Sequence, residues 1–446
     1  MRWSAPAERT GPRLGYAGRH PAAVPRPTLP AGRAAPPGMP LETLPVNAPD
    51  ALAADAPSPR VDGRRGVLTF DRTVYRDDHE MLRETARRFI ARECVPRQHA
   101  WDEAGRVDRE TWRKAGREGL LCMTLPDAYG GAGGDFGHSA VFIEELAYAG
   151  VSGPAFSLQS DIVAPYLLRA GTEAQKQRWL PACARGEVIL AIAMSEPGAG
   201  SDLKAIRTTA IRQGDEYVID GAKTFISSGL NCDLVVVVAK TDPQAGAKGI
   251  SLLLVETDRP GFRRGRKLDK MGQRAADTAE LFFDAVRVPV ENRLGEEGRG
   301  FSYLMAELAQ ERFAIAVSAA ARAEAMLAET IAYTKQRMVF GKPLFEMQNT
   351  RFVLADVKAR VTAMRMMVDT YLALHLRRKL TLEEAALAKL HVTEELSRVL
   401  DALLQLHGGY GYMMEYPIAR AYVDTRVARI YGGTSEVMKE LISRAL

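Results

Sequence analysis

The spacing of hydrophobic residues changes twice along the chain. Between Val74 and about Val188, apolar residues recur at intervals of three and four, the period of a half-buried helix. The members of one such stripe are Met81, Leu82, Ala86, Phe89 and Ile90. From about Ile189 to Leu294 the period falls to two, and from about Gly298 it returns to three and four. The pattern predicts a helical segment, a β segment and a second helical segment.

Short strands are expected in the middle segment, with no helices between them. Tyr217–Ile219 leads into Asp220-Gly221, a pair typical of tight hairpins, and Thr224–Ser227 is expected to be the returning strand. Further expected strands are Leu234–Ala239, Ile250–Val255 and Leu281–Val290. Closely spaced strands of this kind favour a β-barrel or a sandwich.

Capping boxes predict where two helices begin. Thr172 is followed three residues later by Gln175, and Thr381 by Glu384. The second box starts the third of three long helices in the last segment. The other two are expected near 300–337 and 350–379. Long helices with short connections indicate a four-helix bundle.

The predicted fold class is therefore α+β and multidomain. We expect an N-terminal α-helical domain over residues 67–188, a middle β domain over 189–297 and a C-terminal four-helix bundle over 298–446. No Rossmann unit is expected, because no helices alternate with the strands.

Residues 1–66 differ in composition from the rest of the chain. They hold more than half of the 24 prolines, with many Ala and Arg residues and no hydrophobic period. Such a segment buries too little apolar surface to offset its ordering entropy, so we expect a disordered tail. It matches a transit peptide poorly and a secretory signal not at all. A misassigned start codon or a species-specific tail would explain it equally well.

The overall composition argues against several classes of protein. The net charge is only +5, with no basic stripe carrying interleaved aromatics, so no nucleic-acid ligand is expected. No run approaches the ~18 apolar residues of a membrane span. Four scattered cysteines without metal spacing suggest reduced thiols and no metal site, in a bacterial cytoplasm or, in a eukaryote, the mitochondrial matrix.

The loop Ala193–Asp202 is the first candidate site. Pro197 fixes the backbone angle φ, and Gly198 and Gly200 permit positive φ, so the chain is expected to turn sharply and to approach a flat ligand closely. Ser195 and Ser201 add hydroxyl groups. An ordinary turn followed by a helix cap would use the same residues.

Glu311 and Arg312 are the candidate reactive groups. They continue the apolar stripe of the helix after Gly300, close to its buried face. Burial disfavours a charged carboxylate and a nearby cation favours it, a balance that can tune a carboxylate as a general base. A structural ion pair, or a side chain that extends to water, is the alternative.

Three glycine-containing or cationic segments have ligand-binding potential. Gln405–Tyr412 ends a helix with glycines that suit a ligand, a neighbouring subunit or a plain C-cap. Ile430–Glu436 places two glycines before a Thr-Ser helix start, which suits a phosphate or a simple N-cap. Arg337, Phe340–Lys342 and Gln348 offer cationic, aromatic and amide groups, or a solvated helix end.

Taken together and in this order, these motifs resemble the acyl-CoA dehydrogenase family over about residues 70–446. The motifs are AMSEPGAGSD at 193–202, Phe225-Ile226-Ser227, Arg337 with Phe340-Gly341-Lys342, QLHGGYGY at 405–412 and YGGTSE at 431–436. The match is closest to the long-chain branch, through Leu308–Arg312, Gly265–Leu268 and Gly432-Gly433.

The resemblance implies a helical domain, a β domain and a four-helix bundle, usually in a homotetramer, with FAD as cofactor. The residues implied to line the flavin are Ile192, Ala193, Met194, Ser195, Glu196, Pro197, Gly198, Ala199, Gly200, Ser201, Phe225, Ile226 and Ser227. Those implied to reach the FAD of a neighbouring subunit are Arg337, Phe340, Gln348, Gln405, Leu406, His407, Gly408 and Gly409. Those implied to hold the pyrophosphate are Thr434, Ser435 and Glu436. Those implied to contact the substrate are Ser201, Ala309, Gln310, Glu311, Arg312, Gly432 and Gly433.

The sequence departs from many family members at Gly432, where they carry the catalytic glutamate. The long-chain and isovaleryl branches are similar to this chain in placing the base on the bundle helix, which points to Glu311, with Arg312 orienting it. A backbone amide near Gly432 is expected to bind the thioester oxygen. The two glycines leave an open pocket wall, which suits long or branched chains.

The implied activity is oxidation of an acyl-CoA thioester to a trans-2-enoyl-CoA, with electrons passed to an electron-transferring flavoprotein. Two alternatives come from other classes. A related oxidase would return the electrons to oxygen, and a DNA-binding homologue of the fold would use the arginines of the tail.

Overall fold

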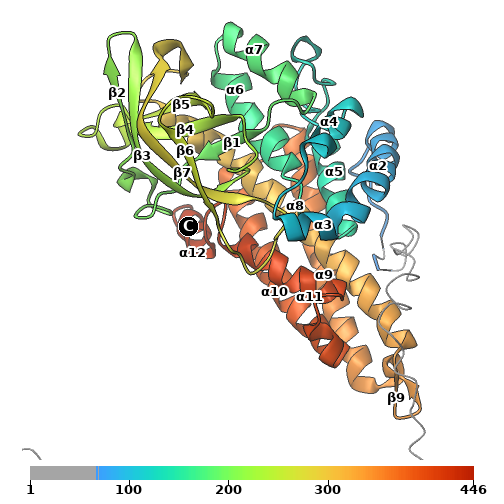
Figure 1. Cartoon of the computed structure of the whole chain (residues 1–446). Helices are drawn as coiled ribbons and strands as arrows, with labels where there is room; N and C mark the ends of the chain where they lie inside the picture. The colour runs from blue at the N-terminus through green and yellow to red at the C-terminus, as the bar shows by residue number, and fades with distance from the viewer. Residues whose placement is uncertain (1–66, 69) are drawn as a thin grey trace, which may run out of the picture. The chain divides into compact units, whose positions relative to one another are not determined.

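The structure is a computed structural model that describes residues 67–68 and 70–446. The tail predicted over residues 1–66 lies outside the described residues. The helical, β and helical order expected from periodicity is confirmed (Figure 1).

The first part is built from short helices around an aromatic core. Trp112 lies edge-on to Phe156, with ring centroids 4.9 Å apart, and Phe142 stacks on Phe156 at 5.7 Å. Thr172 and Gln175 form the predicted capping box at the start of α7. The helices are α2 (Asp77–Phe89), α3 (Gln98–Ala104), α4 (Arg109–Arg117), α5 (Phe136–Tyr148), α6 (Ala164–Ala170) and α7 (Glu173–Ala184), with π-helical turns at Ile90–Cys94 and Leu158–Val163.

The buried face of α2 is more polar than the apolar stripe predicts. Ala86 and Phe89 are buried as expected, but Met81 is 69% exposed. Arg83 is buried instead, because its guanidinium group pairs with carboxylates on α5. Ion pairing therefore outweighs residue hydrophobicity on this face.

All eight strands of the middle part belong to one mixed sheet. Its hydrogen-bonded order is β6-β7-β3-β2-β4-β5-β8, with β1 parallel to β4. The unbroken apolar run of β4 is explained by burial on both faces: Leu234 and Val236 face the helices, whereas Val235 and Val237 face the sheet interior. The strands are β1 (Leu190–Ala193), β2 (Thr209–Gln213), β3 (Glu216–Ser227), β4 (Leu234–Lys240), β5 (Ile250–Glu256), β6 (Phe262–Lys267), β7 (Thr278–Pro289) and β8 (Arg293–Leu294).

The predicted hairpin at Asp220-Gly221 is wrong. Residues 216–227 form one strand, β3, and its pairing with β7 shifts register between Ile219 and Gly221. Asp220 accepts a hydrogen bond from the backbone N–H of Ala285, and a Cβ on Gly221 would lie 2.4 Å from Oγ1 of Thr208. The Asp-Gly pair thus serves a bulge beside a close chain contact. The hairpin lies earlier, at Gly214 between β2 and β3.

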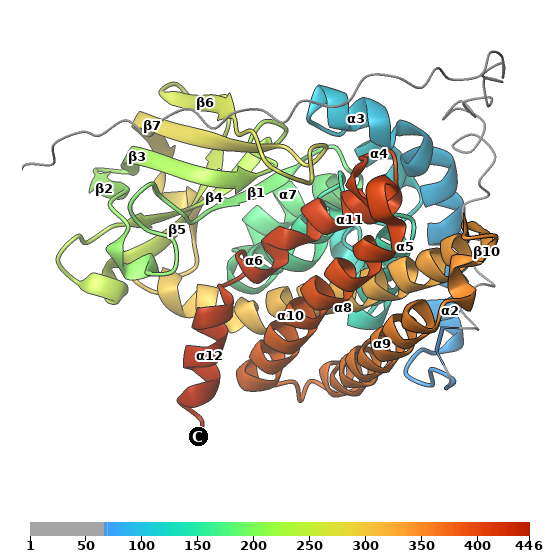
Figure 2. The ribbon, with the colours of Figure 1, turned by 90° about the horizontal axis from the view of Figure 1, so that it is seen from below.

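The last part contains three long helices that run alongside one another (Figures 1 and 2). They share a core of small and aliphatic residues with α5. The capping box of Thr381 and Glu384 is present at the start of α10. The elements are α8 (Gly300–Gln336), β9 (Met338–Val339), β10 (Lys342–Pro343), α9 (Gln348–Leu376), α10 (Leu382–His407), α11 (Pro417–Thr425) and α12 (Ser435–Ser443).

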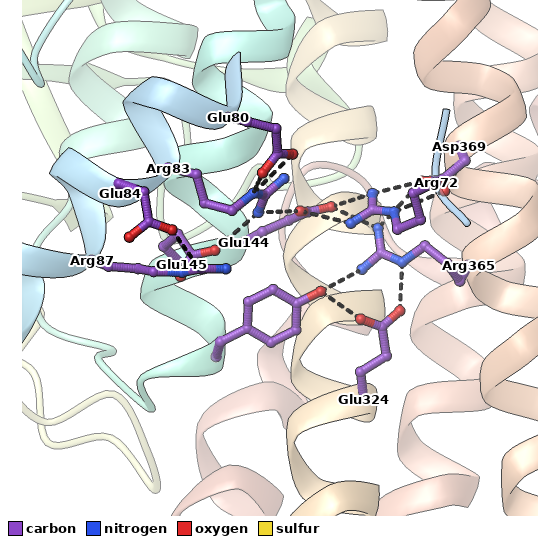
Figure 3. A network of polar contacts seen from close by, with 11 residues as sticks. Arg72, Glu80, Arg83, Glu84, Arg87, Glu144, Glu145, Glu324, Arg365 and Asp369 are labelled. Atoms are coloured by element: carbon purple, nitrogen blue, oxygen red, sulfur yellow. Dashed lines mark hydrogen bonds and ion pairs between the residues drawn. The ribbon is translucent and has the colours of Figure 1, made fainter. Parts of the chain in front are cut away.

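A buried ion network joins the first and last parts (Figure 3). Glu144 of α5 accepts hydrogen bonds from Arg72, Arg83 and Arg365 at 2.7–3.1 Å. Arg365 of α9 also donates to Glu324 of α8, at 2.5 Å. The network connects α2, α5, α8 and α9 through ion pairs.

Candidate active site

Glu311 lies on α8, one helical turn after Leu308 and one before Ile315. Its residue is half-buried, and its Oε2 is shielded from solvent with no hydrogen-bond partner. Burial raises the pKa of Glu311, and the positive charges of Arg312 and Lys389 oppose that rise. A carboxyl group with a raised pKa and one shielded, unpaired oxygen has the properties of a general base.

A turn of two glycines faces this carboxylate. Gly432 and Gly433 both have positive φ, at +61° and +94°. A Cβ on Gly432 would lie 3.5 Å from Oε1 of Glu311. A side chain at position 432 would therefore contact the carboxylate of Glu311. Positions 311 and 432 thus face the same small region of the site.

The space beside the two glycines is filled, so the predicted open pocket wall is wrong. A Cβ on Gly432 would lie 2.6 Å from Cδ1 of Ile315, and one on Gly433 would lie 2.7 Å from Cε of Met438. Ile315 and Met438 occupy the volume that a longer side chain at these positions would need.

Two cations hold the carbonyl groups of this turn. Nε of Arg312 donates to the Gly432 carbonyl at 3.4 Å, and Nζ of Lys389 donates to the Gly433 carbonyl. Burial lowers the pKa of Arg312 and lowers the pKa of Lys389 to about 8. Arg312 therefore interacts with Glu311 through charge alone, and its hydrogen bond goes to the carbonyl group of Gly432. Lys389 was missed from the sequence.

The predicted substrate contacts Ala309 and Gln310 are half-buried on α8. The side-chain amide of Gln310 donates to the backbone carbonyl of Asp161 at 2.7 Å. The hydroxyl group of Tyr166, on α6, is buried without a partner and interacts electrostatically with Glu311. Tyr166 was also missed, because its apolar neighbours make it look like an ordinary core residue.

In the candidate flavin loop, Glu196 has a structural role. Its carboxylate accepts the backbone N–H groups of Arg207 and Thr208 at 2.6 and 3.0 Å and the Nζ of Lys223 at 2.9 Å. Burial alone would raise the pKa of Glu196, but these donors stabilise the ionised carboxylate and bring its pKa below the usual value. The side chain of Glu196 therefore fixes the loop, and only its backbone is left for the predicted contact with a cofactor.

Gly198 and Gly200 do not have the positive φ that was expected of them. A Cβ on either residue would have no atom within 4 Å. Neither the backbone conformation nor the packing of this chain requires glycine there. The turn is closed by paired backbone hydrogen bonds between Glu196 and Ala199, and Ser201 is exposed beyond it. Open space over two glycines is compatible with the close approach of a ligand.

Phe225 stands out on β3 next to this loop. Its side chain is 69% exposed, and its φ is +60°, a conformation that non-glycine residues rarely adopt. The N–H of Thr224 donates to the Ser195 carbonyl at 3.0 Å, which attaches the loop to the strand. Ser227 is also exposed, whereas Ile226 is buried in the sheet interior. An exposed aromatic ring on strained backbone beside an open loop fits a planar ring system as ligand.

One hydrophobic cluster connects the loop with the helix that carries Glu311. Ile192 and Met194 pack against it from the loop side, and Leu304 and Met305 belong to it or pack on it from α8. Ala193 is fully buried in the sheet interior. The loop thus shares apolar neighbours with the part of α8 about two turns before Glu311, and apolar residues of this kind would exclude water from a reaction nearby.

The start of α12 follows the two glycines directly. Oγ1 of Thr434 accepts the N–H of Val437 at 3.2 Å as an N-cap, and the hydroxyl of Ser435 donates to Glu394 at 2.6 Å. Glu436 is exposed. Both hydroxyl groups are used within the chain, so a phosphate here would meet the backbone N–H groups of the first turn.

The remaining predicted cofactor residues lie at the opposite end of the bundle. Arg337, Phe340 and Gln348 are exposed where α8 ends and α9 begins, and the guanidinium of Arg337 is 5.5 Å from the Tyr410 ring. Gln336 is 25 residues beyond Glu311 on α8, about 38 Å at about 1.5 Å per residue. The two sets therefore belong to different surfaces of the chain.

The end of α10 joins this second set. Gln405, Gly408 and Gly409 are exposed, and Leu406 is half-buried. His407 is buried, with its ring stacked on Tyr333 at 4.1 Å and its Nε2 at 3.1 Å from Oγ1 of Thr330. The His407 side chain is thus part of the bundle core, and the glycines after it carry the accessible backbone.

Among the described residues, one group has the spacing of a metal site: Asp78, His79 and His138. Nδ1 of His79 accepts the N–H of Arg76, and Nδ1 of His138 accepts the N–H of Asp135, both at 3.2 Å. The two histidine side chains therefore cap the starts of helices α2 and α5, each as part of a capping box.

Comparison with known protein families decides the identity of the fold. Three family models match consecutive parts of the chain: the acyl-CoA dehydrogenase N-terminal domain over residues 76–187, the middle domain over 191–286 and the C-terminal domain over 298–446. The chain belongs to the acyl-CoA dehydrogenase family.

Individual acyl-CoA dehydrogenases are similar over most of their length. The mitochondrial long-chain specific acyl-CoA dehydrogenase of Mus musculus is 48% identical over 377 residues, which cover 84% of this chain and 88% of the mouse protein. A crystal structure of an acyl-CoA dehydrogenase from Geobacillus kaustophilus has a TM-score of 0.83 at 48% identity and covers 84% of this chain and 99% of its own.

A glutaryl-CoA dehydrogenase from Mycobacterium smegmatis in complex with FADH2 has a TM-score of 0.77 at 30% identity, covering 83% of this chain and 95% of its own. The predicted family, fold class and enzyme class are confirmed: this chain is an FAD-dependent oxidoreductase. No helix among the described residues is long and apolar enough to cross a bilayer.

Proposed function

We propose that this acyl-CoA dehydrogenase oxidises the Cα–Cβ bond of a long- or branched-chain acyl-CoA thioester to a trans-2-enoyl-CoA. Glu311 is the base, and electron-transferring flavoprotein is the electron acceptor. The observation that carries the proposal is the shielded, unpaired Oε2 of Glu311, on a carboxylate whose other oxygen faces Gly432. Long chains are favoured by the 48% identity to long-chain enzymes and no longer by an open pocket wall.

The residues of the chain divide the chemistry between them. Glu311 removes the α-proton of the thioester, and the apolar cluster beside it excludes water. The backbone amide of Gly432 donates to the thioester oxygen, where negative charge develops, and a donor of this kind contributes about 3–4 kcal/mol. Bound FAD supplies the acceptor for the hydride that leaves Cβ.

The residues available for FAD fit its parts. The open loop at Gly198 and Gly200, with exposed Phe225, suits the flavin ring, and the N-terminal amides of α12 suit the pyrophosphate. The set at Arg337 and Gln405–Gly409 lies about 38 Å along α8 from Glu311. We therefore assign that set to the FAD of a neighbouring copy in a homotetramer.

Substitution of the base tests the proposal. Glu311→Gln is expected to retain FAD and to lose nearly all turnover, at least a thousandfold, because an amide cannot accept the α-proton. Glu307→Gln is the matched control: Glu307 lies one turn earlier on α8 and pairs with Arg169 at 2.8 Å. Anaerobic bleaching of the flavin by a panel of acyl-CoAs measures both. Wild-type bleaching by Glu311→Gln would assign the base to another residue.

The electron acceptor needs a separate measurement. We expect little hydrogen peroxide per turnover in air and rapid turnover with electron-transferring flavoprotein. Stoichiometric peroxide would identify an oxidase instead. We place the enzyme in a bacterial cytoplasm or a mitochondrial matrix, in keeping with four free, buried cysteines.

A further inference from the structure

Lys389 is a buried lysine on the face of α10 that packs towards α8. It is 1% exposed, and the residues one turn away on its face are Ala385, Ala386, Val392 and Thr393, all buried. Its Nζ donates to the carbonyl oxygen of Gly433. A lysine is rarely buried this completely without a partner or a task, because its charge is costly to remove from water.

Lys389 also lies close to the carboxylate of Glu311. A Cβ on Gly432 would lie 3.8 Å from Cε of Lys389 and 3.5 Å from Oε1 of Glu311. Because both distances start from one point, the two side chains are no farther apart than these distances together.

The charged groups that face Lys389 come from three helices. Glu311 and Arg312 belong to α8, Glu394 belongs to α10 and Glu436 to α12. Arg312 disfavours the charge on Lys389, and the three glutamates favour it. With a pKa of about 8, Lys389 is mostly protonated at neutral pH.

We propose that Lys389 is a positioning residue for the reaction: it holds the Gly432-Gly433 turn through the Gly433 carbonyl, and its charge lowers the proton affinity of Glu311. The inference rests on the proposed role of Glu311 as the base. The first role holds the Gly433–Thr434 peptide group and thereby limits movement of the turn to which the Gly432 amide belongs. The second role keeps Glu311 ionised at neutral pH despite its burial.

Three substitutions separate the two roles. Lys389→Arg keeps the charge and the donor, Lys389→Gln keeps a donor without the charge, and Lys389→Met removes both. Without the charge, the pKa of Glu311 rises by one to two units, the size of a Coulomb interaction over about 7 Å at an effective dielectric constant of about 20.

The measurement is the pH dependence of kcat/KM for the FAD-loaded enzyme with a long-chain acyl-CoA. Lys389→Gln and Lys389→Met are both expected to move the rising limb upward by one to two pH units. On the high-pH plateau of the profile, Lys389→Met is also expected to lose about tenfold or more in kcat. Lys389→Gln is expected to retain more of its kcat there, because it keeps a hydrogen-bond donor. Lys389→Arg is expected to restore the wild-type limb.

Lys270→Met is the matched control. Lys270 is a half-buried lysine that also donates to a backbone carbonyl, that of Ala276, but its charge faces Asp277 and Asp424. It is expected to leave the limb unchanged. The FAD content and the melting temperature of each variant show whether a loss of activity comes from misfolding. If Lys389→Met does not fold, Lys389→Gln, the milder change, still tests the effect of the charge on the rising limb.

Three outcomes overturn the inference: an unmoved limb in both neutral variants, a limb that moves equally in Lys270→Met, or no restoration by Lys389→Arg. Failure of the base assignment has a different signature. In that case Glu311→Gln retains turnover, whatever the Lys389 variants do.

Discussion

At the scale of single residues, Glu311 is subject to opposing effects. Burial disfavours its charge, and Arg312 and Lys389 favour it. The balance leaves the pKa above the usual value, which suits a group that must take a proton from carbon and later release it. Oε2 has no hydrogen bond to give up when the substrate binds.

The raised pKa predicts the pH dependence of the reaction. Glu311 acts as a base only when ionised, so activity is present above its pKa and is lost as the pH falls through it. We expect the rising limb of kcat/KM to lie above pH 4.5, the ordinary value for a glutamic acid. A stopped-flow series of flavin reduction from pH 4.5 to 8 measures this limb. A plateau that extends unchanged down to pH 4.5 would exclude a carboxylate with a raised pKa as the base.

At the scale of the element, the bulge at Gly221 in β3 depends on contacts distant in sequence. Gly221 has a φ of +152° and lies against Thr208. Gly221→Ala is expected to lower the free energy of unfolding by about 2 kcal/mol or more, because backbone strain and steric overlap with Thr208 add. Gly246→Ala is the control: Gly246 also has positive φ, at +59°, but its Cβ would face open space. It should cost about 1 kcal/mol. Equal losses in urea unfolding would show that the contact with Thr208 is unimportant.

This bulge also shows where sequence reasoning ends. Helix starts such as Thr172 and Thr381 were predictable because the capping box is made within four residues. Asp220-Gly221 has the local chemistry of a hairpin, and only the approach of Thr208 and Ala285 makes it a bulge. Local signals are reliable where local contacts decide the conformation.

The same distinction applies to the site. Glu311 was found because its helix has a clear apolar stripe and because the family places a base there. Glu196 was expected to contact a ligand, but its partners Arg207, Thr208 and Lys223 lie 11–27 residues away. Lys389 did leave a signal, a lysine among the buried residues Ala385, Ala386 and Val392 of α10. That signal could not name its partner, Gly433, 44 residues later.

At the scale of the whole described chain, the ion network around Glu144 ties α5 to α8 and α9. Burial disfavours the charge of Glu144, but Arg72, Arg365 and Arg83 hold its pKa well below the usual value. Its contribution to stability is therefore present above the ordinary pKa of a glutamic acid, 4.5, and is lost as the pH falls through the lower, folded-state value.

Glu144→Gln is expected to lower the free energy of unfolding by about 3–5 kcal/mol, because two buried guanidinium groups, those of Arg83 and Arg365, and the half-buried one of Arg72 lose their shared charged partner. The control is Glu84→Gln, which removes a pair between Arg87 and an exposed glutamate. That change should cost less than about 1 kcal/mol. Denaturant unfolding at pH 7 measures both. Similar small losses would mean that hydrophobic packing alone holds these helices together.

The central claim is that Glu311 removes the α-proton of the substrate. 3,3-Dimethylbutyryl-CoA isolates this step, since it has α-hydrogens but no β-hydrogen to transfer. Incubated with the FAD-loaded enzyme in D2O, it should take up deuterium at Cα, as measured by mass spectrometry, with wild type and Glu307→Gln. With Glu311→Gln the exchange should fall to the rate without enzyme. Exchange by Glu311→Gln at the wild-type rate would contradict the account.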